Sequence, residues 1–193
     1  MFPKKGFTLI ELLIVIAIIA VLSTVVILTL NPAELMRQAR DSNRVSDMST
    51  LKTAISIYLV NVPNPSLAIT YGYSACYLST IGSNGTTTAR CGVFNINNSY
   101  TNVTSTADSY RKVDSNGWLP VQFTLINSGA PFGHLPIDPL NNASYYYAYA
   151  ATSTGGLTFE IDAFMESVKY GVLATKDGGD NDSVYEAGTK LTL

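Results

Sequence analysis

The chain has few of the residues that most often carry catalysis or nucleic-acid binding. Its 193 residues include one histidine, His134, and two cysteines, Cys76 and Cys91, with no metal-ligand spacing around them. Any hydrolytic triad would have to use His134, which lies in a Gly-His-Leu-Pro segment typical of a turn. Only 13% of residues are charged and the formal net charge is −2, which excludes a strongly basic nucleic-acid surface. We therefore expect neither an enzyme nor a nucleic-acid-binding protein, and no required cofactor.

What the chain does have is one long apolar run near its start. A short basic segment, residues 1–6, leads into residues 7–30, which are apolar or weakly polar except for Glu11. At about 1.5 Å per residue this run gives a helix of roughly 36 Å, enough to cross a hydrocarbon core of about 30 Å. A secretory signal would have a shorter core of about 7 to 15 residues and a small-residue cleavage site. Lysines precede the run and arginines follow it, so the positive-inside rule leaves the orientation of the helix in the membrane ambiguous.

Glu11 needs an explanation, because a carboxylate in a membrane helix costs about 2.5 to 3.5 kcal/mol at the bilayer centre and less near the interface. One interpretation is that Glu11 stays hydrated at the headgroups and has no further role. The other is that it meets a cation inside the lipid. Cleavage after Gly6 would create such a cation, the free amino group of Phe7 on a neighbouring copy, and the helix would then serve polymerisation.

The segment Lys4-Lys5-Gly6-Phe7-Thr8-Leu9-Ile10-Glu11-Leu12-Leu13-Ile14-Val15-Ile16-Ala17-Ile18-Ile19 resembles the class III leader and N-terminal helix of type IV pilins and of type II secretion pseudopilins. The resemblance implies that a prepilin peptidase cuts between Gly6 and Phe7 and methylates the new amine of Phe7. It assigns Glu11 to subunit registration in a helical filament of identical chains. It also implies an inner-membrane assembly platform as a partner, a single pass through the cytoplasmic membrane with the head outside, and later a filament at the cell surface.

A second helix is expected over residues 31–62. Asn31-Pro32-Ala33-Glu34 has the pattern of a helix start, with asparagine as N-cap and proline in the first turn. Pro32 separates two rigid helices or, by analogy with pilins, lets part of the stem unwind on assembly. Downstream, apolar residues recur every three or four positions and predict one buried stripe: Val45, Met48, Leu51, Ile55, Tyr58 and Val62. We expect most of the charged residues of this helix to be solvated: Arg37, Arg40, Asp41, Arg44, Asp47 and Lys52.

Residues 63–193 are expected to form one globular head. Pro63-Asn64-Pro65 ends the helix, and a long irregular loop is expected from there to about residue 115. Strand signals follow at 121–126, 145–151, 157–164 and 190–193, separated by Gly, Pro and Asn turns. A helix on such strands predicts a pilin-like α+β fold, with a long N-terminal helix, half membrane-spanning and half amphipathic, packed on a small antiparallel sheet.

Cys76 and Cys91 are expected to form a disulfide, because a head outside the cytoplasmic membrane lies in an oxidising compartment. A loop of about 15 residues closed in this way stabilises a domain by about 3 kcal/mol in the chain-entropy model. Two unpaired thiols are the alternative.

Acidic residues gather near the C-terminus at Asp177, Asp180 and Asp182, with Glu186 following. Oxygen ligands on a glycine-containing loop suit Ca²⁺, although the spacing is not that of an EF-hand. Major pseudopilins carry a calcium-binding C-terminal loop, so the resemblance favours a structural calcium ion here. A solvated acidic turn is the alternative.

Two further segments resemble the major pseudopilin head, Leu135-Pro136-Ile137-Asp138-Pro139 and the tyrosine-rich run Tyr145 to Tyr149. Asp138 is expected to accept backbone N–H bonds in a rigid turn, with metal binding as the minority interpretation. In a strand, Tyr145, Tyr147 and Tyr149 would share one face and Tyr146 the other, in the core or on an adhesive surface.

Three functions remain open at this point: a type IV pilus subunit, a secretion pseudopilin, or a membrane-tethered monomeric binding module. The last would need neither cleavage at Gly6 nor an acid at Glu11.

Overall fold

A computed structural model of the chain describes residues 6–68, 75–81, 91, 93–94, 101–106, 108–153 and 156–193. Its first helix, α1 (Leu9–Leu30), is capped by Thr8. The Thr8 hydroxyl accepts the backbone N–H of Glu11, and Glu11 accepts the backbone N–H of Thr8 in return, a capping box. The residues expected to form most of the cleaved leader, 1–5, lie outside the described part.

The second helix, α2 (Pro32–Asn61), begins directly after a break in the first. Asn31 caps the end of α1 with a left-handed backbone, φ 40°, and its side-chain oxygen accepts the N–H of Glu34. Pro32 then stands at the first position of α2, where its missing N–H leaves no hydrogen bond unmade. The helix restart expected at Asn31-Pro32 is therefore present.

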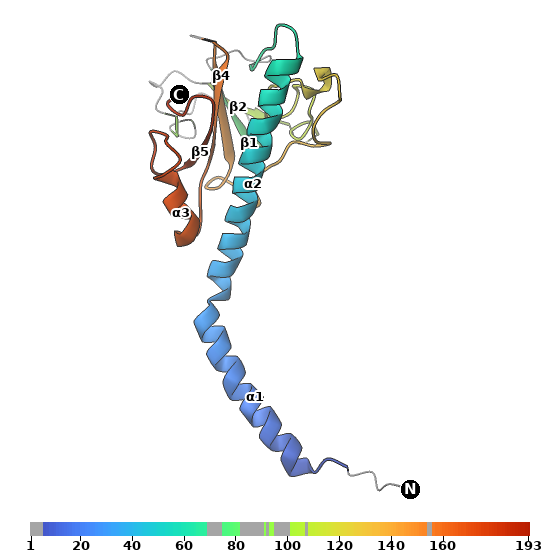
Figure 1. The fold of residues 1–193 in the computed structure, drawn as a ribbon, viewed down its shortest axis with the longest axis vertical. Helices are drawn as coiled ribbons and strands as arrows, with labels where there is room; N and C mark the ends of the chain where they lie inside the picture. Colours follow the sequence, from blue (N-terminus) through green and yellow to red (C-terminus); the bar gives the residue numbers. More distant parts are fainter. Residues whose placement is uncertain are drawn as a thin grey trace. The chain divides into compact units, whose positions relative to one another are not determined.

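The head contains a five-stranded sheet in the order β2-β1-β3-β4-β5. Its strands are β1 (Ala75–Ile81), β2 (Thr101–Ser105), β3 (Tyr147–Thr152), β4 (Thr158–Ala163) and β5 (Tyr185–Gly188). Four of them, β1, β3, β4 and β5, pair antiparallel, whereas β2 runs parallel to β1 at one edge. The α+β pilin-like fold is confirmed, and the parallel edge strand is an addition to the expected antiparallel sheet (Figure 1).

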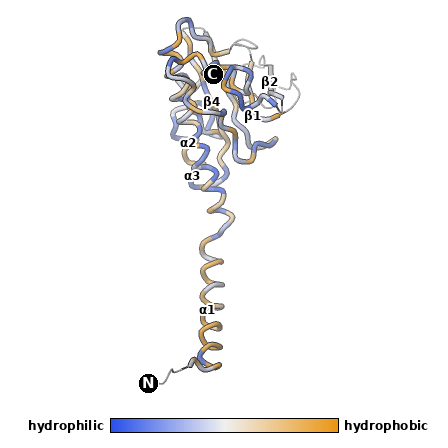
Figure 2. Tube along the Cα trace, turned by 90° about the vertical axis from the view of Figure 1, so that its right-hand side faces the viewer, coloured by the Kyte–Doolittle hydropathy of each residue, from blue (hydrophilic) through white to orange (hydrophobic). Residues whose placement is uncertain are grey.

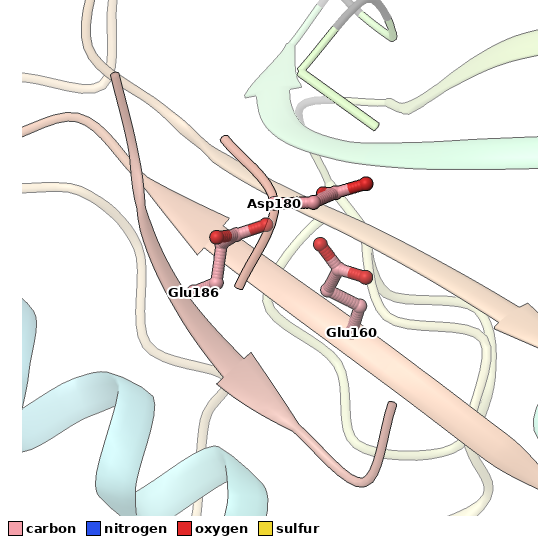
Figure 3. A group of neighbouring side chains, drawn as sticks. All are labelled: Glu160, Asp180 and Glu186. Carbon is pink, nitrogen blue, oxygen red and sulfur yellow. The ribbon is translucent and has the colours of Figure 1, made fainter. Parts of the chain in front are cut away.

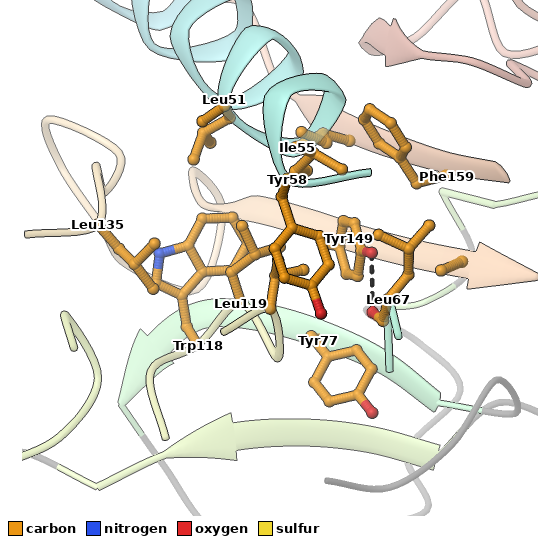
Figure 4. Close-up of a cluster of buried hydrophobic side chains, with 14 of the residues drawn as sticks. Leu51, Ile55, Tyr58, Leu67, Tyr77, Trp118, Leu119, Leu135, Tyr149 and Phe159 are labelled. Carbon is orange, nitrogen blue, oxygen red and sulfur yellow. Dashed lines mark hydrogen bonds between the residues drawn. The ribbon is translucent and has the colours of Figure 1, made fainter. Parts of the chain in front are cut away.

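The C-terminal half of α2 packs on one face of this sheet. Met48, Leu51, Ile55 and Tyr58 are buried in a core shared with alternate residues of the strands, as the apolar stripe predicts. Figure 4 shows part of this core, in which the Tyr149 hydroxyl donates to the Leu67 carbonyl at 2.9 Å. Tyr147 and Tyr149 lie on this face, and Tyr146 belongs to a second core on the other face. The tyrosine run is thus divided by strand alternation and serves core packing.

Several element predictions were wrong. Residues 121–126 contain a short 3₁₀ helix, η1 (Phe123–Leu125), and the last strand is β5 rather than 190–193. The expected irregular loop contains β1 and β2. Six of the seven β1 residues are buried, so both faces of the strand are covered and the alternation that signals a half-exposed strand is missing. A short helix, α3 (Val168–Ala174), was not anticipated either and is capped by the Ser167 hydroxyl.

Candidate functional site

The N-terminal segment carries an uncovered apolar surface. Residues Leu9–Ile27 meet the length and composition of a membrane span, and none of that window is buried. Figure 2 shows the apolar character continuing along α1. Phe7 is 86% exposed and Gly6 is exposed too, so the expected cleavage site lies on open chain just ahead of the first helical turn. An apolar helix without covering side chains requires lipid or other helices around it.

Glu11 is held by its own helix end. Its Oε2 accepts the Thr8 N–H at 2.8 Å and the Thr8 hydroxyl at 2.7 Å. Both bonds satisfy groups at the helix N-terminus, where the helix dipole also favours a negative charge. The carboxylate is thus oriented toward the start of the chain, the end at which cleavage would create an amino group.

The head contains a buried ion network centred on Arg44, which contradicts the expectation that the charges of this helix are mostly solvated. Arg44 is fully buried and donates to Asp138 through Nε at 2.6 Å and Nη2 at 3.0 Å. Its Nη1 donates to Asp41 at 2.7 Å and to Glu166 at 2.6 Å. Arg40 forms a further pair with Glu166 at 2.6 Å. We call this set (Arg40, Arg44, Asp41, Asp138 and Glu166) the Arg44 network.

The Arg44 network joins α2 to two distant segments of the head. Asp41 accepts the backbone N–H groups of Glu166 and Ser167 just before α3, and Asp138 accepts those of Leu140 and Asn141. Asp138 therefore has the expected structural role in its turn and an unexpected ion pair. Hydrogen bonds from Arg40 and Arg44 lower the pKa of Glu166 despite its burial. The network was not predicted because its contacts between α2 and the rest of the head join residues 94 to 126 positions apart along the chain.

A second group of acids lies on the sheet face opposite α2. We call Glu160, Asp162, Asp180 and Glu186 the acidic cluster. Glu160 and Asp162 are two residues apart in β4 and therefore lie on the same face of the sheet. Asp162 is paired across the strands with Glu186 of β5. Carboxylate oxygens of Glu160, Asp180 and Glu186 lie within 4.8 Å of one another. Figure 3 shows these side chains converging from β4, from the loop before β5 and from β5.

Three acids of the acidic cluster are buried and short of hydrogen-bond donors, whereas Asp180 is exposed. Glu160, Asp162 and Glu186 are at most 2% exposed. Within the described residues one oxygen each of Glu160 and Glu186 and both oxygens of Asp162 have no hydrogen-bond partner. Burial raises the pKa of Glu160 to about 8 and raises the pKa values of Asp162 and Glu186 as well. Like-charged carboxylates in a dry site need protons or a cation to neutralise them.

The residues expected to bind calcium are divided by the structure. Asp180 and Asp182 are both exposed, but only Asp180 belongs to the metal-compatible group within the acidic cluster. Asp177 holds the loop in shape, since its carboxylate accepts the N–H of Gly179 at 3.0 Å and that of Glu186 at 2.8 Å. Glu160 was missed because only the pairing of β4 with β5 brings it beside the loop.

The expected disulfide between Cys76 and Cys91 is present, with the two Cα atoms 5.8 Å apart. Cys76 lies in β1 and is fully buried, and Cys91 is 6% exposed. Both belong to the second core, on the same sheet face as the acidic cluster. The lone histidine, His134, is exposed.

Comparison with known proteins gives a match at the N-terminus. Residues 1–27 match the model of the prokaryotic N-terminal methylation motif, which includes the Gly6–Phe7 junction and Glu11. No curated protein and no solved structure matches the chain. The match and the uncovered apolar helix fit a membrane-anchored protein and support the class III prepilin leader. The match thus supports a type IV pilin-like or pseudopilin protein, on the strength of the N-terminal 27 residues.

Proposed function

We propose that this chain is the structural subunit of a type IV pilus or a pilus-like filament, processed by a prepilin peptidase and assembled through its N-terminal helix. The observation that carries the proposal is the combination of an uncovered apolar helix with one carboxylate held near the Gly6–Phe7 junction. Before assembly, lipid covers the helix. In the filament, the helices of other copies replace the lipid around it.

Assembly by this route is repeated head-to-tail contact. Glu11 of one subunit meets the methylated amine of Phe7 on a neighbour, so that each charge is neutralised inside an apolar bundle. Contacts of this kind that do not close into a ring generate a fibre. The partners implied are further copies of the chain, the peptidase and an inner-membrane assembly platform, with the head outside the cytoplasmic membrane.

The experiment that tests this function is mass spectrometry of the intact protein and of its N-terminal peptide, purified from its native membrane. We expect a chain that begins at N-methylated Phe7. A chain that still begins at Met1, in cells that possess the peptidase, would contradict the proposal and favour a tethered binding module, which needs no cleavage.

A secretion pseudopilin is the second candidate, favoured by the acidic residues of the C-terminal loop and the cluster to which Asp180 belongs. Both candidates share the processed helix and differ in the machine that they serve. Electron microscopy of cells producing the protein separates them, since a pilus gives filaments on the cell surface, whereas a pseudopilus at native expression does not.

We propose, in addition, that the acidic cluster holds a structural calcium ion. Its support is the set of buried carboxylate oxygens without partners, because oxygen ligands from carboxylates are those that Ca²⁺ takes. A Cβ atom at Gly179 would collide with the Glu186 carboxylate, so this glycine leaves room for that side chain. Glu160, Glu186 and Asp180 would hold the ion, and Asp162 of β4 is paired across the strands with Glu186. The ion would balance two of the negative charges of the cluster and fix the loop to the sheet.

Calcium is expected to raise the stability of the full-length protein in detergent. Binding to the folded state alone adds about 2.7 kcal/mol at a concentration of one hundred times Kd. The readout is guanidinium unfolding followed by the fluorescence of Trp118, the single tryptophan, which is buried in the head. Glu160→Gln should abolish the calcium effect, while the calcium-free variant stays folded because one buried charge has been removed.

Asp182→Asn is the matched control, since it removes an acid of the same loop outside the acidic cluster. We expect this variant to respond to calcium as the unaltered protein does. Equal loss of the response in both variants would favour the loop set Asp177, Asp180 and Asp182 instead. No response in the unaltered protein would refute the calcium site.

A further inference from the structure

One residue connects the acidic cluster with the segment that carries the disulfide. The backbone N–H of Asn181 donates to Oε2 of Glu186 at 3.3 Å. Its side-chain amide donates to the carbonyl of Val93 at 2.8 Å. Val93 lies two residues after Cys91, and the N–H of the next residue, Phe94, donates to the Cys91 carbonyl at 3.2 Å. Asn181 therefore bridges a cluster carboxylate and the disulfide segment.

The same residue is fixed on its other side. Its Oδ1 accepts the N–H of Ser183 at 3.1 Å, and its carbonyl accepts the N–H of Val184 at 3.2 Å. Val184 is fully buried in the second core together with Cys76 and Cys91. Displacing the loop from the acidic cluster would therefore disturb both the hydrogen bond from the Asn181 side-chain amide to Val93 and the packing around the disulfide.

A second connection runs through the other cluster glutamate. Oε2 of Glu160 accepts the backbone N–H of Leu193 at 2.8 Å, and Leu193 belongs to the second core, as Cys76 and Cys91 do. Both buried glutamates of the acidic cluster thus hold backbone that packs on the disulfide-bearing core. The position of the cluster carboxylates and the closure of this core are mechanically linked.

Reduction of the disulfide requires the core to open. A thiolate must reach one of the sulfur atoms, yet Cys76 is fully buried and Cys91 is 6% exposed. Local opening around Val93 and Phe94 would provide access, at a free-energy cost set by the contacts that hold these residues in place. The bond from Asn181 to Val93 is one of those contacts.

We infer that cation binding at the acidic cluster protects the Cys76–Cys91 disulfide from reduction, through Asn181. This inference rests on the proposed calcium site. A cation that binds Glu186 and Asp180 favours the closed loop, and the closed loop keeps Asn181 on the Val93 carbonyl. By linkage, intact disulfide geometry favours cation binding by the same factor. The head thereby becomes most resistant to reduction where calcium is plentiful, outside the cell.

The test measures the rate of disulfide reduction by dithiothreitol in the full-length protein in detergent, with alkylation and mass spectrometry at each time point. Calcium chloride is compared with sodium chloride at equal ionic strength, after removal of metals with a chelator. Isothermal titration of calcium alone is run on the same sample. We expect calcium to bind and to slow reduction at least about fivefold, the lower end of typical coupling between two sites.

Asn181→Ala is the diagnostic variant. It removes the side-chain hydrogen bond to the Val93 carbonyl and leaves the hydrogen bond from the backbone N–H to Glu186 possible. It should still bind calcium, but calcium should no longer slow its reduction. Asn142→Ala is the matched control, since Asn142 also closes a turn by accepting backbone N–H groups, from Ser144 and Tyr145. This control should keep the full calcium effect.

The outcomes separate the two proposals. If calcium binds and the reduction rate is unchanged, the coupling is refuted and the calcium site stands. If Asn181→Ala keeps the full protection, the link does not run through Asn181 and the inference is wrong. If titration shows no calcium binding to the unaltered protein, the calcium site itself fails and the coupling fails with it.

Discussion

Replacing Glu11 with leucine is expected to give a subunit that is inserted in the membrane and cleaved but absent from filaments. Insertion does not suffer, because removal of a carboxylate makes an apolar helix easier to place in lipid. Assembly suffers because the Phe7 amine of the neighbouring subunit loses its partner inside the helix bundle. Breaking a buried ion pair in this way costs about 3 to 5 kcal/mol, a factor of more than a hundred in subunit addition.

Two further variants separate the charge of Glu11 from its capping role. Glu11→Gln keeps a side chain that can accept the Thr8 N–H, since glutamine serves a capping box as glutamate does. Its filament yield should fall as far as that of Glu11→Leu. Thr8→Ala removes the hydroxyl of the cap, worth about 1 kcal/mol, and keeps the charge, so it should still assemble.

The measurement is the amount of subunit in sheared filaments relative to the processed subunit in the membrane, by immunoblot of both fractions. Normal filament yield from Glu11→Leu and Glu11→Gln would refute the registration mechanism. A loss in Thr8→Ala equal to that in Glu11→Gln would assign the effect to the helix cap.

Replacing Arg44 with methionine is expected to destabilise the head by about 3 to 5 kcal/mol. Methionine fills much of the same volume, so the loss is electrostatic: Asp138 loses both of its guanidinium bonds, and Asp41 loses its one ion pair with Arg44. Arg40 stays with Glu166 and limits the damage at that carboxylate. Guanidinium unfolding of the full-length protein in detergent, followed by Trp118 fluorescence, measures the effect.

Arg37→Met is the control for the Arg44 experiment. Arg37 lies on the same helix and contacts Glu34 at 3.7 Å, with its side chain 53% exposed. An exposed pair of this kind contributes at most about 1 kcal/mol, so the control should change stability little. The stability of Arg44→Lys should lie between those of Arg44→Met and Arg37→Met, because an ammonium group cannot make the bidentate hydrogen bond to Asp138. Equal stability of Arg44→Met and Arg37→Met would contradict a structural role for the network.

The contrast between Arg37 and Arg44 shows what local sequence patterns miss. Both arginines belong to a charged helical segment, and nothing in their immediate neighbours separates them. Of these two, Arg44 is the one that contacts Asp138 and Glu166, which the fold brings from much later in the chain. The same holds for Glu160, an acid within a strand whose relation to Asp180 depends on the pairing of β4 with β5.

Strand prediction failed for a related reason. In β4 and in the tyrosine run, alternating side chains mark two different faces, and the sequence shows where the strands lie. In β1 nearly every residue is buried, so the pattern reduces to a short run with cysteine and serine that resembles a loop. The segment becomes a strand because β2 and β3 lie on either side of it and complete its hydrogen bonds.

The sequence by itself determined the apolar helix, its single carboxylate, the Gly6–Phe7 junction, the helix restart at Pro32 and the apolar stripe of the second helix. These features depend on residues within a few turns of one another, so local spacing and chain chemistry are sufficient to specify them. The tertiary structure alone decided the Arg44 network, the membership of the acidic cluster and the bridge from Asn181 to the disulfide segment. Their partners are far apart in the chain, and charges at such distances acquire defined contacts only when the sheet and the helix have packed.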